Sequence, residues 1–504
     1  MPRPGKGKTP APRPRRVAQP SELPHAPESR PERACDVLVI GAGAAGLFAA
    51  LSARGALDAK GEVTPIPKGA PDVVLLNNEP RLGLKILVSG GSRCNLTNAR
   101  VDQDDYESDA PHVVKRQLRG FTAHAARRFF EARGCKTYEE PLGKVFPRSD
   151  DAREVLRVLL DEVLRAGVPL IAPAEVQALE PPAGPGEPWL ARLSAGEPWR
   201  AKRVVLATGG KSLPKTGSRG FGLGALSRLG HEVREPIPAL TPLEFAAGPL
   251  SGLAGLTVPV VLTLGPQDSP AEQWAGKKFK PDARAAGSLL VTHHGATGPA
   301  PFDVSGPAGR ALREGSGLGL RGDFWSLTLD EGPWVAFLGL DKAPGASLRP
   351  GDAPRPPSRE LFFAQAEPLL ARRERELGTA LAQRLPRSLA RGLLSAVGLD
   401  PALPIKQLNT RQREQLYRAL CQAELRVTGS GGYAKAEVTS GGVLLAELTP
   451  KELESRLQPG LFCCGEVVNV TGRLGGFNFQ WAWSSGFAAG RAAAASLAGA
   501  GSAK

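Results

Sequence analysis

Residues 36–53 read DVLVIGAGAAGLFAALSA, and this stretch decides the fold. Its apolar, β-branched start predicts a strand that is buried on both faces. The strand leads directly into the glycine pattern G-A-G-A-A-G at 41–46 and then into an alanine-rich helix. This order predicts a dinucleotide-binding unit. Gly41 permits the tight turn, Gly43 lets a pyrophosphate approach the backbone, and Gly46 lets the helix pack closely on the strand.

The second strand of this unit is predicted at Asp72–Leu76, after an inserted loop at 58–71. In dinucleotide folds an acidic residue usually ends this strand and binds the adenosine ribose. Here the position holds Asn77, with Glu79 two residues further on. An amide can hydrogen-bond a ribose hydroxyl, but it lacks the added strength of a charged acceptor.

The chain has 504 residues, enough for two or three domains, and a formal net charge of +14. Residues 1–33 hold eight Lys and Arg against three Glu, together with nine Pro, which predicts a disordered basic tail. The tail is interpreted either as a solvated extension or as an arm that contacts nucleic acid or an acidic membrane surface. Because no apolar secretory segment or membrane-spanning run is visible, a cytoplasmic protein without a membrane partner is expected.

The six cysteines form no C-x-x-C motif and no Cys/His spacing typical of a metal site. Neither a disulfide framework nor a bound metal is therefore expected.

The pattern of apolar, Gly and Pro residues changes several times along the rest of the chain. Short alternating runs with many Gly and Pro predict a β-rich unit, and a helical pattern follows it. The chain then returns to dinucleotide-fold character, with a strand ending in Gly465–Glu466 and a glycine pair, Gly475–Gly476, that opens the last helix. The predicted class is α/β, a Rossmann-like domain interrupted by an inserted β-rich unit and a small helical unit. The predicted parts are a tail at 1–33, the first part of the Rossmann-like domain at 34–215, the β-rich unit at 216–350, the helical unit at 351–424, the second part of the Rossmann-like domain at 425–498 and a flexible end at 499–504.

Residues 84–98, LKILVSGGSRCNLTN, allow several interpretations. Paired glycines suggest a phosphate loop, and Cys94 beside Arg93 suggests a reactive thiol, since a neighbouring cation lowers a thiol pKa. The stretch follows the second predicted strand, however, where the chain should run along a bound dinucleotide. No second cysteine that could resolve a disulfide lies nearby. Cys94 is therefore interpreted as a pocket residue rather than a nucleophile.

Several stretches together resemble one family, the BaiN/YhiN-like flavoproteins. This family is also described as aminoacetone oxidase family FAD-binding enzymes or as NAD(P)/FAD-dependent oxidoreductases. The resemblance covers roughly residues 34–498. It rests on the glycine turn, LKILVSGGSRCN (84–95), GKVFPRSD (143–150), ATGGKSLPKTGS (207–218), THHGATGPAP (292–301) and the run from VTSGGV (438–443) to GEVVNVTGRLGGFNFQWAWSSG (465–486).

The resemblance implies a FAD-binding domain with non-covalently bound FAD and a redox role on a small organic substrate. Carried over by position, the implied FAD contacts are Gly41, Gly43, Ala44, Ala45, Gly46, Asn77, Arg81, Lys85, Ser89, Gly90, Gly91, Asn95, Gly465, Glu466, Gly475, Gly476, Phe477 and Asn478.

The chain departs from the family pattern at four places. The family usually has Glu where this chain has Asn77, Gly where it has Ser92 and Asp where it has Asn469. Its G-S-T-G-D-G stretch is here GSRGFG at 217–222. These departures are expected at or near cofactor contacts, where they would affect adenosine affinity or substrate identity.

The expected chemistry is hydride or electron transfer through FAD. No second strand, G-x-G-x-x-G and helix follows, so NAD(P)H is expected only as a transient reductant, with the substrate itself as the alternative donor. His293 and His294 are candidate acid–base residues, or else they only hydrogen-bond a turn. Arg93 and Arg473 could bind a carboxylate or the polar edge of the flavin, or be solvated.

Three functions remain open. The favoured one is a FAD-dependent oxidoreductase acting on a small molecule, because the family stretches argue for it. The alternatives are an RNA-modifying flavoprotein and a flavin-binding protein without turnover. A basic stripe on the folded part would favour RNA, although a nucleic-acid partner is not expected. The oligomeric state stays open.

Overall fold

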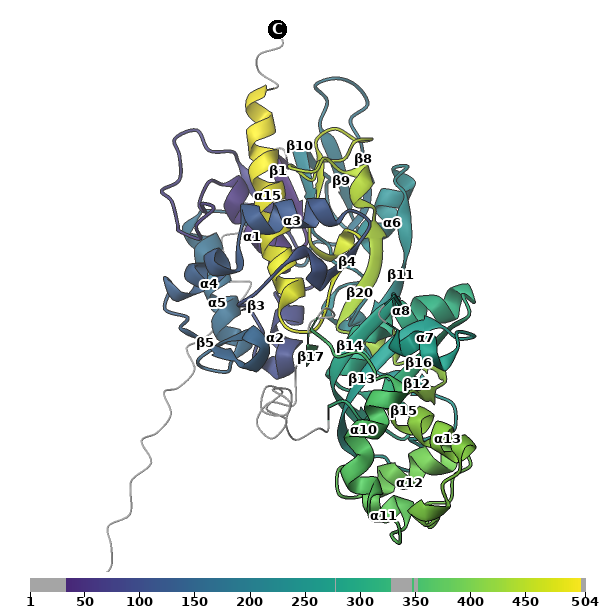
Figure 1. Cartoon of the computed structure of the whole chain (residues 1–504). Coiled ribbons are helices and arrows are strands. Elements are labelled where there is room, and N and C mark those ends of the chain that lie inside the picture. The colour runs from purple at the N-terminus through teal and green to yellow at the C-terminus, as the bar shows by residue number, and fades with distance from the viewer. Residues whose placement is uncertain (1–32, 277, 328–346, 349–351, 500–504) are drawn as a thin grey trace, which may run out of the picture.

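The computed structural model describes residues 33–276, 278–327, 347–348 and 352–499 (Figure 1). The predictions made for 1–32 and for 500–504 lie outside these residues. Two bodies are visible in Figure 1: a larger α/β part that holds both ends of the described chain, and a smaller inserted part below it.

The first sheet joins segments from both ends of the chain. Its seven strands are β1 (Ala34–Ile40), β2 (Val73–Leu76), β7 (Leu170–Ile171), β8 (Val176–Glu180), β9 (Trp189–Leu193), β10 (Trp199–Leu206) and β21 (Leu461–Cys463). The order is β7-β2-β1-β10-β9-β8, with β21 also paired to β10. β7, β2, β1, β10 and β21 are parallel, so the carboxyl ends of β1, β2 and β10 meet at one edge, where such sheets bind nucleotides.

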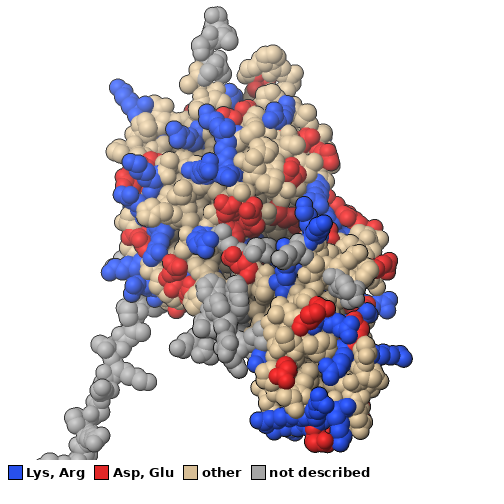
Figure 2. Space-filling model, in the orientation of Figure 1, with Lys and Arg blue, Asp and Glu red and all other residues tan. Residues whose placement is uncertain are grey.

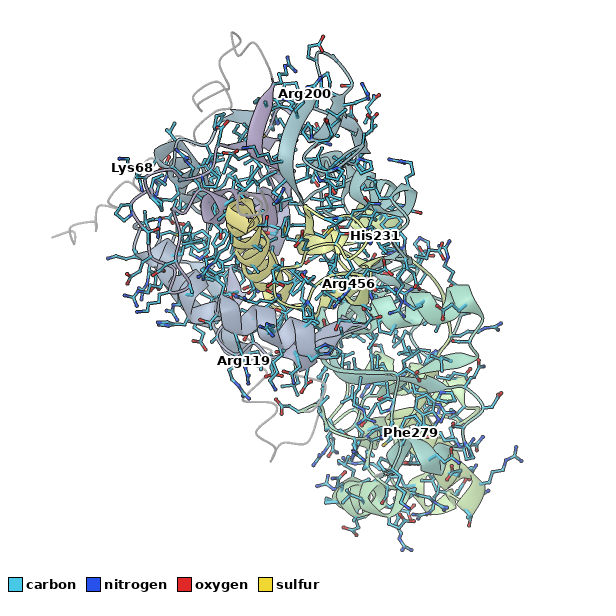
Figure 3. The ribbon with its side chains drawn as sticks, turned by 90° about the horizontal axis from the view of Figure 1, so that it is seen from above. Lys68, Arg119, Arg200, His231, Phe279 and Arg456 are labelled. Atoms are coloured by element: carbon cyan, nitrogen blue, oxygen red, sulfur yellow. The ribbon has the colours of Figure 1, made fainter. Side chains whose placement is uncertain are left out.

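Helices cover this sheet on both faces, in two hydrophobic clusters. The helices of this part are α1 (Ala44–Ala53), α2 (Leu84–Ser92), α3 (Pro111–Gly120), α4 (Ala123–Glu131), α5 (Ala152–Arg165), α6 (Phe221–Arg228) and α15 (Phe477–Gly499). α15 lies along α1, and small residues on the facing sides let the two backbones come close. A Cβ atom on Gly486 or Gly490 would come within 2.3 or 2.1 Å of a carbonyl oxygen of α1. Figure 3 views α15 end-on, surrounded by this part.

The inserted part is built on an eight-stranded antiparallel sheet, ordered β18-β16-β13-β14-β15-β12-β19 with β17 beside β14. Its strands are β12 (Leu243–Phe245), β13 (Thr257–Pro266), β14 (Ala283–Val291), β15 (Gly295–Thr297), β16 (Leu318–Asp323), β17 (Ser347–Leu348), β18 (Ala423–Leu425) and β19 (Val427–Ser430). β19 was expected in the returning Rossmann-like part, but it pairs with β12. The inserted sheet therefore extends to Ser430.

A helical unit packs on this sheet and shares its hydrophobic cluster. It contains α10 (Arg359–Leu370), α11 (Leu377–Leu381), α12 (Arg387–Ala396) and α13 (Thr410–Cys421), while α7 (Ala271–Ala275) and α8 (Pro299–Glu314) belong to the β-rich segment. In Figure 1 the four helices of the unit form the lower end of the molecule.

Three small sheets link the two bodies or support the larger one. The first pairs β11 (Val233–Ala239) with β20 (Val438–Val443), the second pairs β22 (Val470–Gly472) with β4 (Tyr106–Ser108), and the third contains β3 (Thr97–Asn98), β6 (Lys144–Pro147) and β5 (Thr137–Glu140). A short helix, α14 (Gly432–Lys435), precedes β20. The β11–β20 pair connects segments on either side of the insertion, so it sets where the inserted sheet lies relative to the Rossmann-like sheet.

Among the described helices, none combines the length and the apolarity needed to cross a bilayer. Within the same residues, no three His, Cys, Asp or Glu side chains are grouped closely enough to hold a metal ion.

Candidate functional site

A cavity of about 950 Å³ lies where the carboxyl ends of β1, β2 and β10 face the inserted sheet. Its size falls in the range of ligand sites in proteins. All the residues that the resemblance assigned to FAD line this cavity, except Gly46 and Phe477. Residues that are more than four hundred positions apart in the chain therefore line one cavity.

The glycine turn forms one wall of the cavity, and a different constraint favours glycine at each of its three positions. Gly41 has φ of +106°, and a Cβ there would meet the Ala207 carbonyl oxygen at 2.5 Å. A Cβ on Gly46 would lie 1.8 Å from the Gly41 oxygen, so Gly46 serves the contact between helix and turn. At Gly43, by contrast, a Cβ would meet nothing within 4 Å and would point into open space. No side chain caps α1, so its first N–H groups are available to an anion.

Asn77 lies beside this turn, at the end of β2. Its Oδ1 accepts a hydrogen bond from the Ala42 N–H at 3.2 Å, and its Nδ2 donates to the Glu79 carbonyl at 2.6 Å. The amide thus stabilises the glycine turn from the position where an acid was expected. Asn77 lines the cavity, so it can still reach a ribose.

The stretch 84–98 folds as a short helix followed by a left-handed turn. Helical geometry fails at Ser89, and Gly90 and Gly91 follow with φ of +55° and +68°. Ser92 continues the turn with φ of +67°, which is the conformation that favours glycine. The turn folds Gly90 and Gly91 onto the cavity wall.

Cys94 lies behind that wall and is fully buried. Burial raises the pKa of its thiol to about 12, so the thiol is neutral at physiological pH. The Arg93 guanidinium turns elsewhere, to Glu140 at 2.6 Å and over the Phe146 ring at 4.0 Å. This geometry agrees with the interpretation of Cys94 as a pocket residue.

Two polar atoms at the cavity have no partner of their own. Within the described residues, Asn95 Oδ1 and Thr208 Oγ1 are buried without a hydrogen bond, and both residues line the cavity. Buried polar atoms without a partner are rare and are usually satisfied by a bound group. Together with the open space at Gly43 and the uncapped start of α1, these atoms fit a dinucleotide cofactor.

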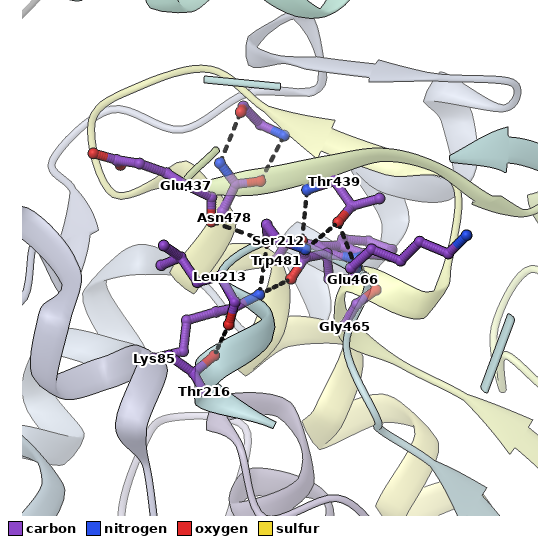
Figure 4. A network of polar contacts seen from close by, with 12 residues as sticks. Lys85, Ser212, Leu213, Thr216, Glu437, Thr439, Gly465, Glu466, Asn478 and Trp481 are labelled. Carbon is purple, nitrogen blue, oxygen red and sulfur yellow. Dashed lines mark hydrogen bonds and ion pairs between the residues drawn. The ribbon is translucent and has the colours of Figure 1, made fainter. Parts of the chain in front are cut away.

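Lys85 and Glu466 meet at the centre of the site, as Figure 4 shows. Lys85 Nζ lies 2.7 Å from Glu466 Oε2, and Ser212 Oγ donates to Glu466 Oε1 at 2.9 Å. The Thr439 backbone N–H also donates to Oε1, at 2.6 Å. Burial alone would raise the pKa of the Glu466 carboxyl, but Lys85 and these hydrogen bonds hold it below the ordinary value. The group therefore stays ionised and paired.

The start of α15 forms the opposite wall. Gly475 and Gly476 have φ of +134° and +93°, and a Cβ on Gly476 would meet the Thr97 carbonyl oxygen at 2.4 Å. The Asn478 amide closes the preceding loop by two hydrogen bonds to the backbone of Gly472. Phe477 is fully buried outside the cavity, so this predicted contact supports the turn from behind.

Arg93 and Arg473, the two candidate arginines, both line the cavity, but each is paired with a carboxylate. Arg93 pairs with Glu140, and Arg473 Nε lies 2.8 Å from Asp105 Oδ1. The Arg473 side chain is 11% exposed, and its guanidinium stacks over the Phe477 ring at 4.4 Å. Both arginines contribute positive charge to the walls of the site.

The structure does not bring His293 and His294 to the cavity. Both side chains are exposed in the turn between β14 and β15, and neither lines the cavity. The His294 carbonyl accepts the Phe245 N–H at 2.9 Å. The alternative interpretation, residues of a turn, agrees with this position.

Sequence reasoning missed the residues that the inserted sheet and its neighbours add to the site. Thr297, Gly298 and Phe302 line the cavity from β15 and α8, and Glu437 lines it from the start of β20. The first two lie in the stretch THHGATGPAP at 292–301, next to the two histidines. Glu437 stands directly before VTSGGV, and nothing in its local pattern distinguishes it from a surface carboxylate.

Glu437 is an unusual group in this cavity. Its N–H donates to the Leu240 carbonyl, and its own carbonyl lies 3.3 Å from Ser212 Oγ. Its side chain extends away from the Lys85–Glu466 pair in Figure 4. Within the described residues nothing hydrogen-bonds its carboxylate. Burial, with a smaller effect of the Asp303 charge, raises the pKa of this carboxyl to about 7.

The four departures from the family pattern lie at different distances from the site. Asn77 lines it, whereas Ser92 does not, although its neighbours Gly91 and Arg93 do. Arg219 of the 217–222 stretch lines the cavity and pairs with Glu79 at 2.7 Å. Asn469 does not line the cavity. It is buried, and its Nδ2 donates to Asp109 Oδ1 at 2.8 Å. Its neighbour Val470 does line the cavity, so this departure is near the site but not in its wall.

Comparison with known proteins places the chain in a family. The model described as HI0933-like protein Rossmann domain matches residues 35–492. A 3-dehydro-bile acid delta(4,6)-reductase of Clostridium scindens is 31% identical over 457 residues, which cover 90% of this chain and 98% of the relative. A ribosomal RNA dihydrouridine synthase of Escherichia coli is also 31% identical, over 90% of this chain and 96% of the relative.

Solved structures give more distant similarity. A 3-ketosteroid-delta4-(5alpha)-dehydrogenase of Rhodococcus jostii is 16% identical with a TM-score of 0.43, covering 94% of this chain and 99% of that chain. A quinol fumarate reductase of E. coli is 18% identical with a TM-score of 0.43, covering 94% and 72%. Both TM-scores are low and carry no argument about function. The family model, in contrast, matches nearly the whole described chain. The protein therefore belongs to the HI0933-like family and is a FAD-dependent oxidoreductase.

Proposed function

We propose that this protein reduces a carbon–carbon double bond conjugated to a carbonyl group. The proposal is supported by one feature that the two relatives share despite their different substrates. A Δ4,6 reduction of a 3-oxo steroid and the conversion of uridine to dihydrouridine both add a hydride and a proton across a double bond that is activated by a carbonyl. Both relatives match this chain at the same identity over nearly their full lengths.

The walls of the cavity suggest which residues hold the cofactor. The N–H groups at the start of α1 and the space at Gly43 suit the pyrophosphate, and Asn77 suits the ribose. The turns at Gly90–Gly91 and Gly475–Gly476 suit the flavin half. FAD, when bound, supplies the hydride for the β-carbon of the double bond. Its two electrons come from a reduced nicotinamide, which we propose binds transiently.

The proton for the α-carbon must come from the chain or from water. We assign it to Glu437, because this carboxyl faces the cavity and no described residue hydrogen-bonds it. Leu240, Phe302 and Val438 line the same cavity. Its pKa of about 7 leaves a substantial protonated fraction at neutral pH, which is what a general acid requires. On the product side, the carboxylate regains a proton from solvent.

The first experiment separates the half-reactions. Purified protein with bound FAD is reduced anaerobically with NADH or NADPH, and the flavin absorbance is followed after mixing with a cyclic enone, a 4-en-3-oxo steroid or ribosomal RNA transcribed in vitro. Reoxidation of the flavin with gain of two hydrogen atoms by any of these acceptors supports the proposal. Reoxidation by oxygen alone, with every acceptor recovered unchanged, would contradict it.

The second experiment concerns the proton. Glu437→Gln should leave flavin reduction by the nicotinamide unchanged and slow reoxidation by the acceptor about 10²-fold or more. In the wild type, reoxidation should slow as the pH rises above about 7, because the protonated form of Glu437 is lost. Glu235→Gln is the matched control, since Glu235 lies outside the cavity, exposed and paired with Arg313. Equal rates and pH profiles in all three proteins would remove Glu437 from the mechanism.

The departures at Asn77 and Ser92 led to a second interpretation of the sequence, a flavin-binding protein without turnover. The same measurements decide it, since bound FAD that no nicotinamide and no acceptor changes would favour that candidate.

A further inference from the structure

A second cavity adjoins the one described above, which we call the flavin cavity. Its volume is about 930 Å³, and it is lined by β4 and β22 of the larger body and by α8 and β14 of the inserted part. Leu240, Phe302 and Arg473 line both cavities. From Phe302 the second cavity follows α8 to Glu314, which is about 18 Å of helix at a rise of ~1.5 Å per residue. It is therefore long enough for an extended ligand that enters the flavin cavity at one end.

Most charged side chains of the second cavity are either paired or exposed at its rim. Arg473 Nε lies 2.8 Å from Asp105 Oδ1, and Arg234 Nη1 lies 3.5 Å from Glu107 Oε1. In Figure 2, Asp and Glu gather between the two bodies, with Lys and Arg beside them. The exposed charged residues of the lining are Asp104, Lys280, Asp282, Glu314 and Arg355.

Arg310, on α8, is the most deeply buried cation of this cavity, with 9% of the residue exposed. Its Nη2 donates to Ser440 Oγ at 3.1 Å, but its Nε is buried without a hydrogen bond among the described residues. Glu107 Oε1 is 3.9 Å from this Nε, too far for a hydrogen bond, and the same carboxylate also serves Arg234. Burial and the Arg234 charge lower the pKa of the Arg310 guanidinium. An exposed arginine without a partner is solvated by water, whereas Arg310 needs a bound group.

Arg284 is a second cation of this kind, half-buried at the start of β14. Its Nε donates to Thr263 Oγ1 at 3.3 Å, and no carboxylate of the described residues lies at ion-pair distance from it. Burial and the neighbouring Arg355 charge lower the pKa of its guanidinium. The remaining lining acid, Asp303, accepts the Leu474 N–H at 2.6 Å. Two lining arginines thus lack a carboxylate at hydrogen-bond distance.

These two arginines favour an anionic ligand over a neutral one. Guanidinium groups bind phosphate in a bidentate manner, and such charge-assisted hydrogen bonds are stronger where water is excluded. Each of the two also has another arginine close enough to affect its pKa, so the cavity can hold more than one negative charge. A neutral enone would leave both guanidinium groups as they are.

The proposed reaction requires a ligand with these properties. The start of α1 offers one diphosphate site, which the proposed function assigns to FAD, and the sequence has no second strand, G-x-G-x-x-G and helix. A reduced nicotinamide dinucleotide must bring its ring into the flavin cavity while its phosphates lie elsewhere. The second cavity adjoins the flavin cavity and carries the arginines that phosphates need.

We infer that the second cavity binds the phosphate groups of a reduced nicotinamide dinucleotide, with Arg310 and Arg284 as their ligands. The nicotinamide enters the flavin cavity past Phe302 and Arg473, which line both spaces. The inference rests on the proposed function for its need of a nicotinamide donor, and on Arg310 and Arg284 for the place where that donor binds.

The test uses four variants of the full chain with FAD bound. Arg310→Gln and Arg284→Gln each remove one positive charge from the second cavity, and Arg310→Lys keeps the charge but not the guanidinium. Arg313→Gln is the matched control, because Arg313 lies one turn further along α8, is exposed, pairs with Glu235 and lines neither cavity. FAD content and thermal unfolding are measured first. If Arg310→Gln does not fold, Arg284→Gln and Arg310→Lys carry the comparison.

The first readout is binding to the oxidised protein by calorimetry, with NAD⁺, NADP⁺ and inorganic diphosphate as probes. Arg310→Gln and Arg284→Gln should each raise the Kd of the nucleotide that the wild type binds by about 10-fold to 100-fold, as expected for a lost charge-assisted hydrogen bond. Arg310→Lys should lose less, and Arg313→Gln should bind like the wild type. Diphosphate should compete with the nucleotide. Equal Kd values in all proteins, or no nucleotide binding by the wild type, overturn the inference.

The second readout is anaerobic reduction of the flavin by NADH or NADPH over a range of concentrations. The two glutamine variants should need about 10-fold to 100-fold more nucleotide for half-saturation and keep the limiting rate, because the lost contact is remote from the flavin. Dithionite-reduced protein is then mixed with two cyclic enones, one of which carries a carboxylate. Variants that weaken only the carboxylate-bearing enone would show that the arginines bind the acceptor, which contradicts the inference.

The same data separate this inference from the proposed function. If nucleotide binding depends on Arg310 and Arg284 but no acceptor reoxidises the flavin, the proposed reaction fails and the second cavity remains the donor site. If an enone reoxidises dithionite-reduced flavin in the wild type but no nicotinamide nucleotide binds, the reaction stands with another donor and the assignment of the second cavity is wrong.

Discussion

Lys85 Nζ lies 2.7 Å from Glu466 Oε2, although 381 positions separate the two residues in the chain. Lys85 comes from the helix after β2, and Glu466 follows the strand that returns from the insertion. The pair therefore fastens the last segment of the Rossmann-like body to the first, at the cavity wall. Glu466 is held on its other side by Ser212 and Thr439, and among the described residues Lys85 is the cation paired with it.

Replacing Lys85 by Met should show how much the buried charge of Glu466 depends on Lys85. Glu466 would remain buried with its charge uncompensated, so the free energy of unfolding at pH 7 should fall by about 3 kcal/mol. The loss should shrink towards pH 4, because the Glu466 pKa in the variant is no longer held down and the carboxyl becomes protonated in both states. Urea unfolding at the two pH values measures this change. Lys202→Met, which removes an exposed partner of Asp36, is the control and should cost at most about 1 kcal/mol.

In the wild type the same pair predicts an acid limit. The pKa of Glu466 in the folded protein lies below its ordinary value of 4.5. Its contribution to stability is therefore present above about pH 4.5 and is lost as the pH falls through the folded-state pKa. A Lys85→Met protein as stable as the wild type at both pH values would show that the pair contributes nothing.

Ser92→Gly should stabilise the protein. Ser92 has φ of +67° directly after two left-handed glycines, and a non-glycine residue in this region costs about 1 kcal/mol. Glycine removes that cost, and the side chain is exposed, so no buried contact is lost. Ser395→Gly is the control, because Ser395 is exposed within α12 and glycine should there lower stability by about 0.5 kcal/mol. Thermal unfolding of both variants should give shifts of opposite sign.

The glycine turn and the Lys85–Glu466 pair show how much of the structure could be predicted from the sequence. The glycine turn was predictable because each of its glycines answers a local constraint that recurs in every such turn: a left-handed φ, an open approach or a close helix contact. The strands β1, β2 and β10 were predictable for a similar reason, since a parallel strand buried on both faces is a continuous apolar run. The contact between Lys85 and Glu466 was not predictable from local pattern, because it depends on how the chain returns after the insertion.

The candidate acid–base residues also show that local sequence does not determine which side chains reach the cavity. His293 and His294 were singled out because of their residue type, yet the register of β14 and β15 places them in an exposed turn. Glu437 has no local signature, and it enters the site only because the start of β20 meets Leu240 and Phe302 at the cavity. The pairing of β19 with β12 was also missed, since a four-residue strand of Val, Thr, Gly and Ser has no periodicity that assigns it to one sheet.

Gly43→Val should separate cofactor binding from folding. A Cβ at Gly43 meets no protein atom within 4 Å, so the fold can accept the larger side chain. The side chain would instead fill the space next to the first N–H groups of α1, where the pyrophosphate is proposed to bind. We expect near wild-type unfolding of the apoprotein and at least a 100-fold weaker FAD affinity, estimated as about 3 kcal/mol for blocking a close backbone approach. Fluorescence quenching of added FAD measures the affinity.

Gly46→Ala is the matched comparison at the same turn. A Cβ there would lie 1.8 Å from the Gly41 carbonyl oxygen, so this smaller change should destabilise the apoprotein itself. If Gly43→Val bound FAD like the wild type, the cofactor would not approach the turn at this residue.

Cys94→Ser should leave turnover intact. The thiol is fully buried, and its pKa of about 12 leaves almost none of it as thiolate at pH 7, so it cannot serve as a nucleophile there. Serine keeps the size of the side chain and adds a hydroxyl whose burial should cost at most about 1 to 3 kcal/mol, reduced by a hydrogen bond within the turn. The measurements are FAD content, flavin reduction and reoxidation, and the rate at which native protein reacts with a thiol reagent. Cys421→Ser is the control, since Cys421 is equally buried in the helical unit and does not line the cavity. Complete loss of turnover in Cys94→Ser with FAD still bound, and not in Cys421→Ser, would falsify the structural assignment and return Cys94 to the catalytic residues.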